Sequence, residues 1–459
     1  MKKITVFGGG TVGSSVAKTL SDDGIDVTVI DNDEKTLKDL QEKIDIKTVC
    51  GNAAYPTIQK LAGTDDSDMV IAVTASDETN LVSCQIAKKI FNVPRTVARL
   101  RPHDYLASEG GFEKKLFSID EIISPSILLT NYIKNIMDHP GAFQVFEFSG
   151  GLLQLVGAKV LAEGPLAEGK LSDFRKHLPN VDARVVLIFR DGKPIFPRGS
   201  TIVKTDDEVF FIATEENMRF MSEFRKPQQA AHNVMIAGGG NVGSALAKKL
   251  EKNYRVKLVE RDKSRSKMVS EELSSTVVLN DDISDEGFLR DENVSEVDYF
   301  CAITNDDQIN ILSSKLAKEM GAKKTIAIVN KASYRSLVSK ELDIVVSPAD
   351  VTIGSLLASV RTGDIVNVHS LGRGDAEAIE LIVHGDAETS NLVGKNIAQL
   401  NLPETINIGA LIRKGQVVLA NTEKGNMTIE SGDRIILFIL SNEDVSVIEK
   451  LFSVGARFF

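Results

Sequence analysis

Short apolar runs alternate with helix-period segments along most of the chain, which favours an α/β fold. The run at 4–7, ITVF, is apolar apart from Thr5 and leads into a glycine-rich turn. Val12, Val16 and Leu20 then recur at helical spacing, and the next apolar run ends in Asp31. This alternation is typical of a parallel sheet that is covered by helices on both faces.

The same order of elements returns in the second half of the chain. Gly238 opens a second glycine-rich turn, 230 positions after Gly8. Downstream, AITNDDQIN resembles AVTASDETN, and the VVSP at 345–348 resembles the IISP at 122–125. The repeated order indicates an internal duplication.

After each SP comes a helix-like stretch, and the pattern then changes to strands and hairpins, with turns expected at Asp191-Gly192 and Lys414-Gly415. We therefore expect two Rossmann-like, doubly wound parallel-sheet domains, each followed by a small α+β C-terminal domain. The expected boundaries are 1–124, 140–225, 232–348 and 366–453, with a polar linker near 223–233.

A broad apolar stripe marks the helix expected after the first SP, SILLTNYIKNIMDH. Two interpretations are open: the helix packs on its own domain, or it crosses to a partner subunit or another domain. Under the second interpretation, charged substitutions at Leu129 and Ile133 should break the oligomer.

Composition narrows the class of protein. The 459 residues are 42% hydrophobic and 26% charged, with a net charge of −10. No long run of like charge is present, which argues against a partner nucleic acid. The apolar runs fall short of the roughly 18 residues of a spanning helix, and no signal peptide is visible. Three widely spaced cysteines are expected to be small buried side chains. We expect a cytoplasmic protein.

The first glycine-rich turn reads G-x-G-x-x-G at Gly8, Gly10 and Gly13. Glycines let a pyrophosphate approach the unpaired amides of a helix N-terminus. Asp31 can accept hydrogen bonds from ribose hydroxyls and would repel a 2′-phosphate, which favours NAD(H) over NADP(H). ATP and ADP carry the same ribose and stay possible. Arg99 follows a later strand, from which its guanidinium could reach phosphate oxygens.

The second turn has the same glycines, Gly238, Gly240 and Gly243, and an acid at Glu260. It lacks the cations of the first site. In the alignment of the two halves, Ile328 takes the place of Arg99 and Asn330 takes the place of Arg101. Two interpretations stay open for this turn: ligand binding, or tight strand–helix packing alone.

Catalytic constellations are missing from the sequence. The six histidines make no metal-ligand spacing, and neither a G-x-S-x-G nor a G-x-x-x-x-G-K-[ST] motif is present. We therefore expect no catalytic residue, no metal site and no enzyme activity. The sequence indicates that a nucleotide is bound and sensed.

The motifs GGGTVGSSVA, VTVIDND, CGNA, AVTASDETN, TVARLR and IISP occur in this order. Together with their second copy, they resemble the nucleotide-binding domains that regulate potassium conductance (the RCK or KTN family), over essentially the whole chain. The resemblance implies a regulatory subunit on the cytoplasmic face of the membrane. Such a subunit would form a homo-oligomeric ring, expected to be a tetramer, that gates an integral-membrane potassium transporter of the Trk type.

The resemblance also implies the site residues and the cofactors. The cofactor is expected to be NAD(H), with ATP and ADP as further candidates. The expected first site comprises Gly8, Gly9, Gly10, Thr11, Val12, Gly13, Asp31, Thr74, Ala75 and Arg99; the expected second site comprises Gly238, Gly240, Asn241, Val242, Gly243 and Glu260. The chain departs from the family's Gly-Asp-Ala pattern at 51–53, where it has Gly-Asn-Ala, and at 280–282, where it has Asn-Asp-Asp.

Two alternatives belong to other functional classes. One is a soluble adenylate or NAD sensor that acts on a non-transport partner, which the glycine turns cannot distinguish from a transport regulator. The other is an NAD-dependent oxidoreductase, for which the sequence supplies no evident acid/base group.

Overall fold

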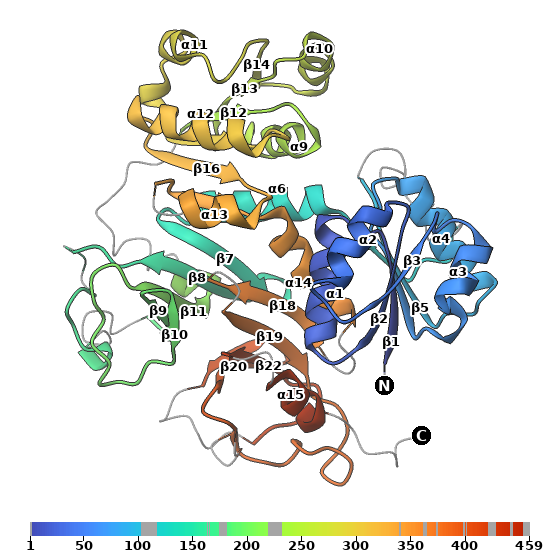
Figure 1. Cartoon of the computed structure of the whole chain (residues 1–459). Helices are drawn as coiled ribbons and strands as arrows, with labels where there is room; N and C mark the ends of the chain where they lie inside the picture. The colour runs from blue at the N-terminus through green and yellow to red at the C-terminus, as the bar shows by residue number, and fades with distance from the viewer. Residues whose placement is uncertain are drawn as a thin grey trace. The chain divides into compact units, whose positions relative to one another are not determined.

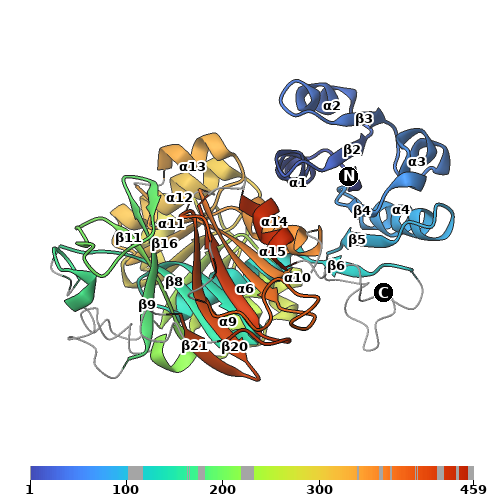
Figure 2. The same ribbon diagram turned by 90° about the horizontal axis from the view of Figure 1, so that it is seen from below.

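The chain forms two compact units in the computed structural model (Figures 1 and 2). One comprises Met1–Ile123, Gln144–Arg225 and Thr352–Phe459, and the other Ser124–Phe143 and Lys226–Val351. The structure describes residues 2–101, 117–162, 164, 166–173, 181–218, 232–338, 341–360, 365–372, 375–397, 400, 402–420, 428–440 and 444–452. Within these ranges, no helix has both the length and the apolar character needed to cross a membrane.

The first half opens with a parallel six-stranded sheet in the order β3-β2-β1-β4-β5-β6. Helices α1 and α2 lie on one face and α3 and α4 on the other (Figure 2). This is the strand order of a Rossmann fold, with its crevice between β1 and β4, where the order of the strands reverses. The elements are β1 Lys3–Phe7, α1 Thr11–Asp22, β2 Asp26–Asp31, α2 Glu34–Gln41, β3 Lys47–Cys50, α3 Pro56–Ala62, β4 Met69–Ala72, α4 Asp77–Lys89, β5 Arg95–Arg99 and β6 Glu121–Ile123.

The second half repeats this sheet in the order β14-β13-β12-β15-β16-β17. Consecutive residues of β12, β15 and β16 are buried, as expected for a sheet that is covered on both faces. The elements are β12 Asn233–Ala237, α9 Asn241–Leu250, β13 Arg255–Val259, α10 Lys263–Glu272, β14 Val277–Leu279, α11 Glu286–Asp291, β15 Tyr299–Ala302, α12 Asp307–Glu319, β16 Lys324–Ile328, α13 Ala332–Val338, β17 Ile344–Val346 and α14 Pro348–Val360.

Two small antiparallel sheets complete the fold, in the orders β10-β9-β11-β8-β7 and β18-β19-β22-β20-β21. Their shared topology extends the duplication, and the predicted α/β class with two Rossmann-like and two small α+β domains is confirmed. The elements are β7 Ala142–Phe148, β8 Leu153–Lys159, β9 Ala183–Arg190, β10 Lys193–Ile195, β11 Glu208–Thr214, β18 Ile365–Leu371, β19 Ala376–Ile382, β20 Ile406–Arg413, β21 Gln416–Leu419, β22 Arg434–Ile439 and α15 Val445–Phe452.

Both predicted hairpin turns are confirmed. Asp191 and Gly192 have φ angles of 51° and 76°, and Lys414 and Gly415 have φ angles of 49° and 81°. Two positive φ angles in succession are the signature of a type I′ turn, whose twist matches that of the flanking strands. The turns connect β9 to β10 and β20 to β21.

The two small sheets contact each other within one compact unit. The Ser149 hydroxyl donates to Glu380 Oε1 over 2.6 Å, and Arg184 Nη1 donates to the carbonyl of Ile408 over 2.7 Å. The rings of Phe146 and His369 stack with their centroids 4.6 Å apart. These two residues occupy equivalent positions in β7 and β18, so the pairing follows the internal repeat.

Helix α6, Pro125–Asp138, packs against α9 of the second half. Leu129 and Ile133 are buried, at 3% and 0% exposure. The interpretation that this helix leaves its own domain for another domain is therefore correct. Because the partner helix lies in the same chain, the inference that charges at these positions break an oligomer no longer follows.

The cysteines and the linker were also the subject of expectations from the sequence. Cys84 and Cys301 are buried as predicted, but Cys50 is exposed, because β3 is an edge strand that ends at this residue. Most of the linker expected near 223–233 lies outside the described residues.

Candidate functional site

The first glycine turn joins β1 to α1, and each of its glycines has a different steric reason. Gly8 has a φ of +105°, and a Cβ there would lie 3.0 Å from the Thr74 backbone. A Cβ on Gly13 would lie 1.8 Å from the carbonyl oxygen of Gly8. A Cβ on Gly10 would meet no atom within 4 Å. Gly8 and Gly13 thus permit tight packing, whereas Gly10 faces open space in which a ligand can approach the backbone.

Helix α1 presents an open N-terminus to this space. Gly10 is its N-cap, no side chain of the described residues caps it, and its first turn carries no acidic residue. The neighbouring helices α2 and α4 are capped by the side chains of Asp33 and Ser76. The first-turn amides around Thr11 and Val12 and the positive end of the helix dipole are therefore available to an anion such as a diphosphate.

Asp31 stands at the end of β2 beside the same turn. Its Oδ2 accepts a hydrogen bond from the Gly9 amide over 2.6 Å, and its Oδ1 accepts one from the Asp33 amide over 2.9 Å. Two backbone donors hold the carboxylate in place next to the glycines. A carboxylate oxygen has lone pairs for more than one donor, so Asp31 can still accept from ribose hydroxyls.

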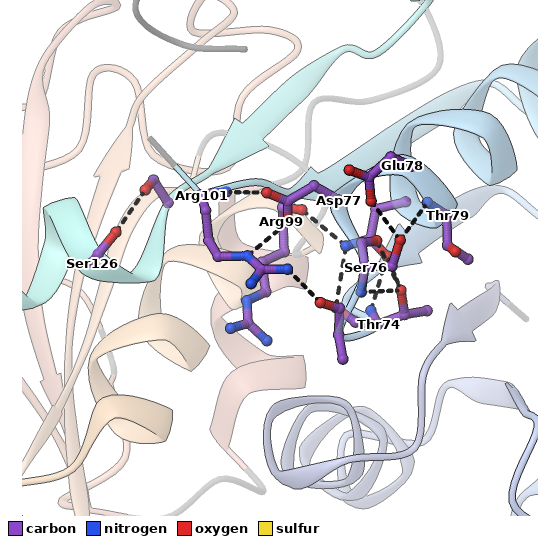
Figure 3. A network of polar contacts seen from close by, with 11 residues as sticks. Thr74, Ser76, Asp77, Glu78, Thr79, Arg99, Arg101 and Ser126 are labelled. Carbon is purple, nitrogen blue, oxygen red and sulfur yellow. Dashed lines mark hydrogen bonds and ion pairs between the residues drawn. The ribbon is translucent and has the colours of Figure 1, made fainter. Parts of the chain in front are cut away.

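The buried amide of Asn80 links Thr74, just past the end of β4, to Arg99 at the end of β5. Figure 3 shows Thr74 and Arg99 close together. Asn80 Oδ1 accepts from the Thr74 amide over 2.9 Å and from its hydroxyl over 2.7 Å. Asn80 Nδ2 donates to the Arg99 carbonyl over 2.9 Å. Because Asn80 is fully buried, this network fixes the ends of β4 and β5 relative to each other.

The two arginines at the end of β5 differ in what they bind. Arg101 Nε donates to Asp77 over 3.3 Å, and its Nη2 donates to the Ala75 carbonyl over 2.6 Å. The guanidinium of Arg99 has no hydrogen-bond partner among the described residues and lies beside that of Arg101 (Figure 3). Burial and the neighbouring Arg101 lower the pKa of Arg99. A partly buried cation without a partner, close to a second cation, suits an anionic ligand.

The second turn has the same backbone frame. Gly238 has a φ of +107°, a Cβ on Gly243 would lie 1.9 Å from the Gly238 carbonyl oxygen, and one on Gly240 would meet nothing within 4 Å. Helix α9 starts at Asn241 without a side-chain cap from the described residues. Glu260 Oε2 accepts from the Gly239 amide over 2.7 Å, as Asp31 does in the first site.

The second site lacks the two cations, as predicted. Asn310 still binds the Thr304 amide and the Ile328 carbonyl, each over 2.9 Å, but Ile328 carries no charge. Asn330 replaces Arg101 and donates through its backbone and its side chain to Asp307. The frame is kept, and the charge at the end of β16 is lost.

The structure therefore places the residues predicted for each site around one glycine turn. The predicted site residues lie in the turn itself, in the first helical turn with Val12 or Val242, and at the ends of neighbouring strands. Sequence reasoning left the positioning residues Asp77 and Asn80 out of the site. Their signal was available, because the same acid and amide recur at Asp307 and Asn310 in the second half.

Comparison with known families follows the same division of the chain. The TrkA-N domain model matches residues 4–125 and 234–348, and the TrkA-C domain model matches 155–225 and 386–453. The chain is thus a tandem of two TrkA-N/TrkA-C pairs, in which each glycine turn falls in a TrkA-N domain.

Full-length relatives narrow this class to one family. The chain is 46% identical over 459 residues to the Trk system potassium uptake protein TrkA of Halomonas elongata, covering all of both chains. It is 43% identical to the protein of the same name from Vibrio alginolyticus, over 99% of this chain and all of the relative. The chain belongs to the family of Trk system potassium uptake proteins TrkA.

Solved structures share the fold at low sequence identity. The crystal structure of the GsuK RCK domain superposes with a TM-score of 0.62 at 16% identity, covering 98% of this chain and 95% of that one. The GsuK channel bound to NAD gives a TM-score of 0.61 at 16% identity, over 98% of this chain and 79% of that one.

Proposed function

We propose that this chain is a cytoplasmic, nucleotide-binding regulatory subunit of a membrane potassium transporter. In this proposal it assembles as a homo-oligomeric ring, a tetramer, on a Trk-type transporter and gates potassium uptake without turning over its nucleotide. Its four domains would have the boundaries expected above. Nucleotides that bind two ring conformations with unequal affinity would bias the pore by population shift.

The open helix N-terminus at Gly10, between Asp31 and Arg99, carries the nucleotide part of the proposal. The three groups match three parts of NAD(H): helix amides for the diphosphate, a carboxylate for ribose hydroxyls and a guanidinium for a phosphate oxygen. ADP and ATP carry the same three parts. A related fold, the GsuK channel, has been solved with NAD bound, which supports the choice of NAD(H) as the first ligand.

The names of the full-length relatives support the transport part. All of the relatives compared above are named as potassium uptake proteins of the Trk system, and the similarity covers both halves of the chain. Among the described residues no helix could span a membrane, so a pore would have to be supplied by another subunit.

Isothermal titration of NADH into the full chain tests the nucleotide part. Arg99→Ile installs the residue of the second half, and Asp31→Ala removes the ribose carboxylate. Each should weaken the first site about tenfold or more, the size of one lost charge-assisted hydrogen bond. Asp26→Ala is the control, because Asp26 is an exposed carboxylate at the opposite end of β2. Unchanged affinity in both site variants would contradict the assignment.

A pull-down from detergent-solubilised membranes of the source organism tests the transport part. Tagged protein is incubated with NADH, with ATP or without nucleotide, and the retained proteins are identified by mass spectrometry. A polytopic potassium transporter whose amount changes with nucleotide supports the proposal. Recovery of soluble proteins alone would favour a sensor of another kind.

A further inference from the structure

Positive charge stands on opposite sides of the two glycine turns. In the first half Arg99 ends β5, and in the sheet order β5 and β2, which ends in Asp31, lie on opposite sides of β1. In the second half that side carries Ile328 and Asn330, and neither brings a charge. The second half has an arginine on the other side instead, at Arg265 in the first turn of α10.

Arg265 has no counterpart of the same chemistry in the first half. Counted from the acid that ends the second strand, its equivalent is Thr36. Thr36 donates its hydroxyl to Asp33 over 2.8 Å and so serves only the cap of its own helix. Arg265 Nε donates to the carbonyl of Gly239 over 2.8 Å, within the glycine turn itself.

Arg265 and Glu260 therefore hold the two ends of one peptide segment. Glu260 accepts from the Gly239 amide, and Arg265 donates to the Gly239 carbonyl. The backbone of Arg265 is fixed as well, because its amide donates to Asp262 Oδ1, the cap of α10, over 2.7 Å. The guanidinium is thereby anchored beside the carboxylate that is assigned to the ribose.

The two Nη atoms of Arg265 lack a strong hydrogen-bond acceptor among the described residues. Its Nη1 lies 3.2 Å from the sulfur of Met268, a weak acceptor, and its Nη2 is shielded from solvent with no hydrogen-bond partner among the described residues. A buried donor without an acceptor costs free energy, which a ligand oxygen in that place would recover.

We infer that Arg265 contacts the bound nucleotide. Through this contact the second site recognises mainly the adenosine monophosphate part of the nucleotide. Its unused N–H groups can donate to a ribose or phosphate oxygen, and its flat face can stack on adenine. Neither Ile328 nor Asn330 can hold the second phosphate by charge, and the next cation along the chain, Lys331, has its Nζ over the ring of Tyr334. The second site should then distinguish little between AMP, ADP and NADH, whereas the first site uses Arg99 to prefer the diphosphates. This inference rests on the proposed function.

Titration of proteins with one working site tests the inference. Asp31→Ala combined with Arg99→Ile disables the first site, and Glu260→Ala disables the second. In the protein that keeps the second site, AMP should bind within about fivefold of NADH; in the protein that keeps the first, AMP should bind about tenfold or more weaker than NADH.

Adding Arg265→Thr, the residue of the first half, to the protein that keeps the second site should weaken AMP and NADH alike, by about tenfold. Arg265→Lys, which keeps the charge but loses the planar fork, should recover only part of that loss, and far-ultraviolet circular dichroism checks that both variants fold. Unchanged affinity in Arg265→Thr, or an AMP affinity at the second site more than about fiftyfold below that of NADH, overturns the inference while nucleotide binding stands. If neither single-site protein binds any of the three nucleotides, the proposed function fails first and the inference with it.

Discussion

Acidification should loosen the pairing of the two small sheets through His369. Its Nε2 is shielded from solvent and has no partner among the described residues, and the ring stacks on Phe146. Burial lowers the pKa of His369 from 6.5 to about 4, against the opposing effects of the Glu147 backbone and of Glu380. The folded chain therefore holds this imidazole neutral at pH values where the unfolded chain has protonated it.

The sign and the size of the effect follow from these two pKa values. Below pH 6.5 the unfolded state binds a proton that the folded state does not, so stability falls with pH until it levels off near pH 4. Between about pH 7.5 and pH 5, the loss from His369 should be at most about 2 kcal/mol, since one pKa unit corresponds to about 1.4 kcal/mol. It is an upper value because part of the residue stays in contact with water.

Hydrogen-exchange mass spectrometry on peptides of β18 measures this loss locally, which suits a chain of several domains. Carboxylates titrate over the same range, so the quantity of interest is the difference in opening free energy between the native chain and His369→Phe at each pH. Phenylalanine is the residue of the equivalent position, Phe146. The control His384→Gln removes an exposed histidine of the same small domain. Profiles of the native chain and His369→Phe that stay parallel from pH 7.5 to pH 5 would refute the reasoning.

Three further substitutions test the packing that supports the sites. Gly13→Ala should cost about 2 kcal/mol, because its Cβ would lie 1.8 Å from the Gly8 carbonyl oxygen; a lowered midpoint of thermal unfolding checks this. Ile133→Asp should destabilise the α6–α9 packing by about 3 kcal/mol or more. The control Ile127→Asp, at a position 42% exposed, should change little. We expect faster hydrogen exchange in α9 peptides of the first variant only. Asp433→Ala should cost about 1–2 kcal/mol, because it removes two hydrogen bonds of Arg413 while the contact of that arginine with Glu430 remains; an unchanged midpoint of unfolding in guanidinium chloride would contradict this.

The local part of the fold could be predicted from the sequence, because period and turn chemistry act over a few residues. Alternating apolar runs gave the strands of both parallel sheets, and the pairs Asp191-Gly192 and Lys414-Gly415 gave the hairpins. The destination of α6 could not be decided in this way. Its stripe with Leu129 and Ile133 requires an apolar partner but does not say which helix provides it.

The candidate site was predictable to a similar depth. The glycines and Asp31 follow from a known spacing, and their placement around one turn depends only on the strand order of the fold. The contact of Arg265 with the turn was not visible, because a surface arginine on a polar helix is unremarkable in sequence. Only the folded position of α10 brings its guanidinium to the Gly239 carbonyl.

The duplication separates what the turn needs from what its ligand needs. Several residues kept in both halves satisfy the backbone: Gly8, Gly13 and their counterparts, which would clash if they had a Cβ, and the amides Asn80 and Asn310, which bind their own strand ends in the same way. The residues that differ, Arg99 and Arg265 among them, carry charges with unused hydrogen-bond donors beside open space. If the second turn served packing alone, the unpaired Nη2 of Arg265 beside Glu260 would lower the stability of the folded chain without any compensating role. Because the frame of the turn is kept while the arginines beside its opening differ, we expect both turns to bind nucleotide and to recognise different parts of it.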